Sequence, residues 1–141
     1  MSLIYWDTML FIYWLEAHPR HGKQVEQVHR RMVQRSDRLC TSVFTVGEVL
    51  TGAYKSGRRT EAQQIRNYFE SSAVRLLPFN TDAAERYATI RAEYKVAPAD
   101  AIHLATASVA KVDVYLTNDS ALRKLSIDGI QFIAGLDGVI F

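Results

Sequence analysis

Residues 98–119 read PADAIHLATASVAKVDVYLTND, and this stretch decides the fold class. Pro98 stands where a helix commonly has its first residue, so we expect a helix at 98–111. The short apolar run at 112–116 predicts a buried strand, and it is followed by Thr117, Asn118 and Asp119. A helix that leads into a buried strand is one repeat of an α/β chain, in which the strands lie parallel in a sheet.

The same alternation runs through the rest of the chain. Apolar runs predict strands at 3–6, 38–43, 74–79, 112–116 and 130–133. The segments between them predict helices at 8–16, 23–35, 45–56, 60–71, 81–94, 98–111 and, as a short one, 120–125. Thr81 or Asp82 is expected to cap the helix at 81–94. We therefore expect an α/β fold with a parallel twisted sheet covered by helices on both faces, formed by one domain at 1–141.

Four acidic residues fall where an apolar run ends or a helix begins, namely Asp7, Glu48, Asp100 and Asp119. In an open parallel sheet, ligands bind outside the carboxyl ends of the strands, so these residues are expected to meet at one edge. Two unit charges about 4 Å apart repel by about 4 kcal/mol at an effective dielectric constant of about 20. A fold that gathers four carboxylates therefore needs a cation.

The chemistry of the side chains narrows the choice of cation. Oxygen ligands suit hard cations, so we expect Mg²⁺ or Mn²⁺. The histidines and the cysteine do not cluster with the spacing of zinc ligands, which argues against zinc.

Each acid also has a purely structural interpretation. Asp7 is placed to cap the helix that follows it. Thr45 and Glu48 match the S/T-x-x-E pattern of a capping box. Asp100 is favoured by the positive end of its helix dipole, and Asp119 is placed to cap the short helix after it.

Composition and charge add limits on the class of protein. The formal net charge of +2 is too small to indicate a nucleic-acid binder, although basic residues gather at 18–38 and 55–66. Cys40 is the only cysteine, so no disulfide can form within the chain, and a reducing, cytoplasmic location is expected. The apolar run at 9–15 is too short to span a bilayer, and its helix is expected to be buried or to meet another chain.

Several segments together resemble the PIN domain, and in particular the VapC-type ribonuclease toxins of toxin–antitoxin pairs. They are IYWDT at 4–8, TSVFTVGEVLTGAYKSG at 41–57, ADAIHLATA at 99–107 and VYLTNDSALRKL at 114–125. With their spacing, these segments cover most of the chain. Met9 departs from the family pattern, in which a small polar residue is usual two positions after the first aspartate.

The resemblance implies a PIN-like fold and an endoribonuclease that cleaves single-stranded RNA, leaving a 5′-phosphate and a 3′-hydroxyl. By it, Asp7, Glu48, Asp100 and Asp119 match the metal-binding acids of the family, with Asp7 and Asp100 preferred as direct ligands. Glu48 and Asp119 are expected to bind the Mg²⁺ or Mn²⁺ ion through water or to position the attacking water. The resemblance also implies a cognate antitoxin as partner, and a homodimer.

Other polar residues lie close to these acids in sequence. Thr8, Thr117 and Asn118 are candidate hydrogen-bond partners of the metal ligands. His103 lies three residues after Asp100, on the same face of a helix. It is a candidate proton shuttle or phosphate contact, but packing between helix and sheet is the favoured interpretation.

Basic and aromatic residues are candidates for contact with RNA. The candidates for contact with the RNA backbone are Arg20, Arg58 and Arg59. The candidates for stacking on RNA bases are Trp6, Tyr13 and Trp14, but packing of these side chains in the core or in an interface is favoured.

Three other functions are compatible with parts of this pattern. One is a housekeeping PIN-type nuclease that processes RNA, and another is a nuclease-like domain that only binds RNA or a partner. The third is a Mg²⁺-binding phosphoacceptor signalling domain, which needs an aspartate directly after the central strand and a lysine on a later strand. That design is disfavoured, because Asn80 follows the strand at 74–79 and Thr117 follows the one at 112–116.

Overall fold

A five-stranded parallel sheet forms the centre of the computed structural model, which describes residues 1–137. Its strands are β1 (Leu3–Trp6), β2 (Arg38–Ser42), β3 (Arg75–Leu77), β4 (Val114–Leu116) and β5 (Phe132–Ala134). They lie in the order β3-β2-β1-β4-β5, and every neighbouring pair is parallel. The predicted parallel sheet is therefore confirmed.

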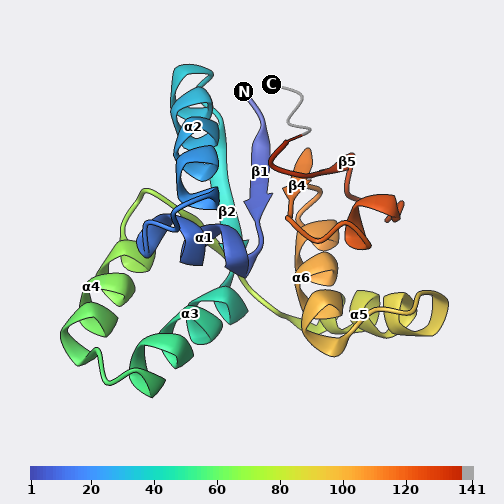
Figure 1. Cartoon of the computed structure of the whole chain (residues 1–141). Helices are drawn as coiled ribbons and strands as arrows, with labels where there is room; N and C mark the ends of the chain where they lie inside the picture. The colour runs from blue at the N-terminus through green and yellow to red at the C-terminus, as the bar shows by residue number, and fades with distance from the viewer. Residues whose placement is uncertain (138–141) are drawn as a thin grey trace.

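Helices cover both faces of this sheet, as predicted (Figure 1). They are α1 (Thr8–Leu15), α2 (His21–Gln34), α3 (Val43–Lys55), α4 (Arg59–Glu70), α5 (Thr81–Glu93) and α6 (Pro98–Val109), with a 3₁₀ turn η1 (Leu122–Lys124). Helices α1 to α4 lie on one side of the sheet in Figure 1, and α5 and α6 on the other. Among residues 1–137, no helix has both the length and the apolar character needed to cross a membrane.

Alternation along β1 divides the interior into two cores. Successive side chains of a strand point to opposite faces, so Ile4 and Trp6 lie on one face and Tyr5 on the other. The first core joins Ile4 and Trp6 to apolar residues of α1 to α4, and the second joins Tyr5 to residues of α5 and α6. All three side chains are fully buried, which fixes the position of the strand that precedes Asp7.

The strand order creates a switch point between β1 and β4. From β1 the chain proceeds to β2 and β3 on one side, and it then crosses to β4 and β5 on the other. Tyr5 of β1 pairs with Tyr115 of β4, so the ends of these two strands lie side by side. Asp7 follows β1 and Asp119 follows β4, at the kind of crevice where open α/β sheets bind ligands.

The start of α3 differs from the prediction. Strand β2 ends at Ser42, whose side chain accepts a hydrogen bond from the Phe44 amide at 3.0 Å and caps the helix. Val43 therefore belongs to the helix and Thr45 lies inside it, where its hydroxyl bonds to that of Thr41 at 2.7 Å. The predicted capping box of Thr45 and Glu48 is wrong, which leaves the Glu48 carboxylate to other partners.

Other boundaries move by a few residues for local reasons. Asn80 caps α5 by accepting from the Ala83 amide at 3.0 Å, in place of Thr81 or Asp82. Strand β3 stops before Pro78, which has no amide hydrogen to donate to a neighbouring strand. Lys111 has a left-handed φ of 56°, so α6 stops short of it and β4 begins only at Val114.

The segment after β4 also differs. The helix predicted at 120–125 is reduced to the three-residue turn η1, and β5 begins two residues later than predicted. Asp119 lies in the loop between β4 and η1, after Thr117 and Asn118, and its side chain does not cap η1.

Candidate active site

Asp7 has the capping role considered for it in sequence, and it also makes a contact across the switch point. It is the N-cap of α1, and its Oδ1 accepts from the Leu10 amide at 3.4 Å. Its other oxygen, Oδ2, accepts from the Thr117 hydroxyl at 2.5 Å, across the switch point. Burial raises the pKa of this carboxyl, and the bond from Thr117 and the nearby His103 only partly offset that effect.

Glu48 is held by two donors from other elements. Its Oε1 accepts from the hydroxyl of Thr8 in α1 at 2.5 Å and from Nε2 of His103 in α6 at 2.7 Å. Burial alone raises the pKa of Glu48, but the bonds from His103 and Thr8 bring it below its ordinary value. The side chain is therefore held as a carboxylate at the point where α1, α3 and α6 meet.

Asp100 and Asp119 lie at the same edge with little support from the protein. The Asp100 carboxylate, in the first turn of α6, accepts no hydrogen bond from the described residues. Its pKa is raised by burial and then by the negative charges of Asp119 and Glu48, with a partial offset from His103. Asp119 is exposed, accepts from the Ala121 amide at 2.9 Å, and donates its own amide to the Thr117 hydroxyl at 3.1 Å.

These contacts bring the four predicted acids to one edge of the sheet. Asp100 is within electrostatic reach of Asp119 and Glu48, and Asp7 is joined to the Asp119 loop through Thr117. Over residues 1–137, no Lys or Arg side chain forms an ion pair with any of the four. Within the described residues, His103 is the one basic side chain that contacts any of the four acids, through Glu48.

Tyr115 supplies a further observation about this edge. Its hydroxyl is fully buried, yet it has no hydrogen-bond partner in the described chain. Burial raises its pKa first and Tyr5 next, and the charges of Asp7, Asp100 and Glu48 add smaller effects in the same direction. The Tyr115 ring stacks on that of Tyr5 in the second core, with 4.9 Å between the ring centroids. A buried hydroxyl without a partner is uncommon, and in the described chain the Trp6 indole nitrogen and the Tyr68 hydroxyl share this feature in the other core.

The donor set fits a hard, hydrated cation. Over residues 1–137, no three His, Cys, Asp or Glu side chains already stand in an arrangement that could hold a metal ion. All of the candidate ligands are carboxylate oxygens, the type that Mg²⁺ and Mn²⁺ prefer. Mg²⁺ usually keeps several waters and takes only one or two protein carboxylates directly, so it does not require three acids in direct contact with the ion.

The predicted hydrogen-bond partners of the acids divide into two kinds. Thr8 and Thr117 are buried, and each donates to one candidate acid. Asn118 is exposed, and its amide instead donates to the Tyr13 hydroxyl at 3.4 Å. It contacts none of the four acids through its side chain.

His103 has a place at the site that its favoured interpretation did not include. It is 4% exposed, so packing between helix and sheet is confirmed, but both ring nitrogens also have polar partners. Nδ1 lies 2.7 Å from the Tyr5 hydroxyl, and Nε2 lies 2.7 Å from Glu48 and 3.2 Å from the Thr8 hydroxyl. The spacing of three residues from Asp100 was the only sequence signal of this role.

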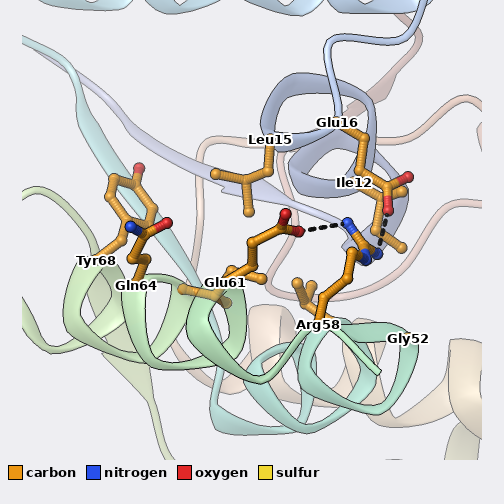
Figure 2. A pocket seen from close by; sticks show the side chains of 10 residues that line it. Ile12, Leu15, Glu16, Gly52, Arg58, Glu61, Gln64 and Tyr68 are labelled. Atoms are coloured by element: carbon orange, nitrogen blue, oxygen red, sulfur yellow. Dashed lines mark hydrogen bonds and ion pairs between the residues drawn. The ribbon is translucent and has the colours of Figure 1, made fainter. Parts of the chain in front are cut away.

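A separate hollow of about 560 Å³ lies between α1, α3 and α4, and Figure 2 shows its walls. Its lining is largely apolar and includes none of the four acids. Arg58 extends across one side, where it donates to Glu16 and to Glu61, each at 2.9 Å (Figure 2). Of the three arginines considered for RNA contact, Arg58 is thus engaged, whereas Arg20 and Arg59 are exposed.

The apolar helix α1 is only partly covered. Leu10 and Phe11 are fully buried, whereas Met9 is 43% exposed and Leu15 is 39% exposed. Trp6, which precedes the helix, is fully buried and belongs to the core rather than to a surface that could stack on bases.

Comparison with known proteins relates this architecture to a family. The family model of the PIN domain matches residues 4–128. A search of curated proteins finds no match.

Solved structures with the same fold include several toxin–antitoxin complexes. DNA-bound VapBC from Salmonella typhimurium is 27% identical, with a TM-score of 0.73 over 96% of this chain and 99% of that one. VapBC2 from Rickettsia felis, bound to a fragment of its promoter DNA, is 15% identical, with a TM-score of 0.76 over 94% and 98%.

VapC20 from Mycobacterium tuberculosis, described as a toxin that cleaves the sarcin–ricin loop, shares the fold at 16% identity. Its TM-score is 0.68 over 87% of this chain and 96% of that one. The predicted resemblance to VapC-type proteins is thus confirmed, and the match over residues 4–128 shows that the chain belongs to the PIN domain family.

Proposed function

We propose that the chain is a divalent-metal-dependent endoribonuclease that cleaves single-stranded RNA as the toxin of a toxin–antitoxin pair. The observation that carries this proposal is the group of four acids at the switch point, which no Lys or Arg side chain of residues 1–137 neutralises. PIN domain nucleases generally use divalent metal ions, and oxygen-only ligands favour Mg²⁺ or Mn²⁺.

The proposed roles follow from the contacts of each acid. Asp7 and Asp100 hold the cation directly, because Asp100 is free of hydrogen bonds and Asp7 is fixed by the cap of α1 and by Thr117. Glu48 and Asp119 bind through water or orient the attacking water. A divalent ion, when bound, would lower the pKa of its water and neutralise negative charge on the phosphoryl group in the transition state. The expected products carry a 5′-phosphate and a 3′-hydroxyl.

The proposed partners are a cognate antitoxin and a second copy of the chain. The solved VapBC structures that share this fold are complexes with an antitoxin, which supports an inhibitor protein here. Met9 and Leu15 are apolar side chains of α1 that remain exposed, which supports burial of that helix in an interface. A cytoplasmic location is supported by Cys40, a buried free thiol in a chain that has no other cysteine.

The decisive experiment is cleavage of a mixed-sequence, fluorescently labelled single-stranded RNA with Mg²⁺, Mn²⁺ or EDTA. We expect cutting by the wild type that depends on metal and is lost in Asp100→Asn. The matched control is Glu93→Gln. Glu93 is exposed on α5, so this substitution removes one negative charge at a place away from the acids. Absence of metal-dependent cutting across RNAs of varied sequence, in protein free of antitoxin, would refute the proposal.

A phosphoacceptor domain remains the competing function, because an aspartate does follow the central strand of the sheet. Strand β1 rather than β3 is central, and it is followed directly by Asp7, which fills the acceptor position. The lysine is still missing, since β4 is followed by Thr117 and β5 by Gly135. Stable labelling of Asp7 by acetyl phosphate would favour this function over the nuclease.

A further inference from the structure

A chain of hydrogen bonds links the acidic edge to the interior of the sheet. Tyr5 of β1, His103 of α6 and Glu48 of α3 lie in series, with 2.7 Å between the Tyr5 hydroxyl and Nδ1 and 2.7 Å between Nε2 and Oε1. Tyr5 is fully buried and His103 almost so, while Glu48 is half-buried at the edge. The three residues therefore connect the core to one of the candidate metal ligands.

The chemistry of the end groups sets the direction of these bonds. An ionised carboxylate can only accept, so the hydrogen between His103 and Glu48 belongs to Nε2. A neutral imidazole that carries its hydrogen on Nε2 leaves Nδ1 as an acceptor. The Tyr5 phenol keeps its hydrogen at neutral pH, and it donates that hydrogen to Nδ1. Glu48 and Tyr5 thus favour the same tautomer of His103, the one that donates to Glu48.

The two donors to Glu48 converge on the same oxygen. Oε1 accepts from both Thr8 and His103, whereas Oε2 accepts from no described residue. This arrangement restricts the rotation of a glutamate side chain, which otherwise has many rotamers, and it leaves one oxygen available to a cation or its water.

We propose that His103 is a positioning residue for the nuclease, and that Tyr5 stabilises the tautomer in which it orients Glu48 without touching RNA. The proposal rests on the proposed function for its catalytic meaning. The orientation itself is a property of the protein alone, and it can be measured without RNA.

A matched pair of substitutions separates positioning from packing. In His103→Gln the amide nitrogen reaches the place of Nε2 and can still donate to Glu48. In His103→Asn the shorter side chain reaches only the place of Nδ1, so it meets Tyr5 but not Glu48. We expect His103→Asn to lose about 10- to 100-fold in Mn²⁺ affinity and in kcat, the usual range for residues that orient a ligand, and His103→Gln to recover most of the loss.

A third variant tests the link to Tyr5 directly. Nitrogen-15 NMR of the histidine rings in metal-free protein should show His103 with its hydrogen on Nε2. In Tyr5→Phe the buried Nδ1 loses its donor while Glu48 still accepts from Nε2, so the preference for this tautomer should weaken and Mn²⁺ affinity should fall by a few-fold. Thermal unfolding of each variant shows whether the folded state is kept, and Tyr5→Phe carries the test if His103→Asn does not fold.

The possible results divide cleanly. The proposal is overturned if His103→Asn binds Mn²⁺ as tightly as the wild type does. It is also overturned if His103 carries its hydrogen on Nδ1 in the wild type. A third contrary result is an equal loss of Mn²⁺ affinity in His103→Gln and in a folded His103→Asn. If the tautomer and the Mn²⁺ affinities follow expectation while no variant or wild type cleaves RNA, the proposed function fails and the positioning of Glu48 stands.

Discussion

Thr117 occupies the junction between two of the candidate acids. Its hydroxyl donates to Asp7 at 2.5 Å and accepts from the Asp119 amide at 3.1 Å, and it is fully buried. One hydroxyl thus holds the carboxylate that follows β1 and the loop that follows β4 in a single arrangement.

Substitution of this residue tests that arrangement. Thr117→Val keeps the shape but removes both bonds, leaving a buried carboxylate without its donor, while Thr117→Ser keeps both. We expect Thr117→Val to lower kcat/KM for RNA cleavage by about 10-fold or more. It should also destabilise the protein by about 1–3 kcal/mol, the cost of an unsatisfied buried group. Cleavage rates and urea unfolding measure the two effects, and equal behaviour of the two variants would contradict this role.

The sequence predicts the acids better than it predicts their partners. Asp7 follows its apolar run directly and Asp119 follows its own after Thr117 and Asn118, so their place beyond a strand end can be read from local pattern. His103 depends on residues 98 and 55 positions away, namely Tyr5 and Glu48. No local pattern distinguishes a histidine that only packs from one that also orients a carboxylate.

At the scale of the elements, the order of strands and helices follows from periodicity, while the boundaries depend on single side chains. Ser42 and Asn80 end their extended segments because their side chains accept from helix amides. Thr45, three residues after Ser42, and Thr81, the residue after Asn80, have equally suitable side chains. The choice between neighbouring caps depends on which residue the sheet holds extended, and this is decided by tertiary pairing.

The turn before β5 depends on a glycine. Gly129 has a φ of 90°, and a Cβ there would lie 2.3 Å from the Ser108 carbonyl oxygen. Ser108 also bonds to the carbonyl of Asp128, and Arg86 donates to both, so the backbone cannot easily move away.

We expect Gly129→Ala to destabilise the protein by about 1–3 kcal/mol or more, because strain and a clash act together. Gly47→Ala is the control, since a Cβ in the helix α3 meets nothing within 4 Å. It should stabilise by about 0.5–1 kcal/mol. Urea unfolding gives both values, and a loss of stability of equal size in the two variants would contradict the close approach to Ser108.

The packing of α2 against α1 contains a group that responds to pH. His29 lies with its ring centroid 4.6 Å from that of Trp14 and 6.1 Å from that of Trp6, and burial lowers its pKa. A histidine with a lowered pKa in the folded state contributes stability that is present above its unfolded pKa of about 6.5. This contribution is lost as the pH falls through the folded pKa.

We therefore expect the wild type to lose stability between about pH 7 and pH 5 more steeply than His29→Phe, which keeps a ring but cannot be protonated. The free energy of unfolding measured across this range in both proteins isolates the contribution of His29. Identical slopes would show that His29 is protonated as easily in the folded chain as in the unfolded one.

At the scale of the whole molecule, the site depends on the order of the strands. Local patterns show that strands exist, but they do not show that β1 is central or that β4 lies beside it. For this reason the sequence alone suggested the strand at 74–79 as the central one in the comparison with a phosphoacceptor domain, whereas β1 holds that place. Four acids spread from residue 7 to residue 119 become neighbours only because the chain crosses from β3 to β4 past the centre of the sheet.

This dependence makes metal binding a probe of the folded state. The unfolded chain separates the acids, so a cation that they hold together stabilises only the folded protein, by RT ln(1 + [L]/Kd). At 100 times the dissociation constant this amounts to about 2.7 kcal/mol, or a rise of several degrees in Tm for a chain of about this size. We expect a Mn²⁺ titration to raise Tm in the wild type and in the Glu93→Gln control, and much less in Asp100→Asn. Calorimetry in EDTA gives the reference for each protein, and an equal rise in all three would show that Mn²⁺ binds somewhere other than the acidic edge.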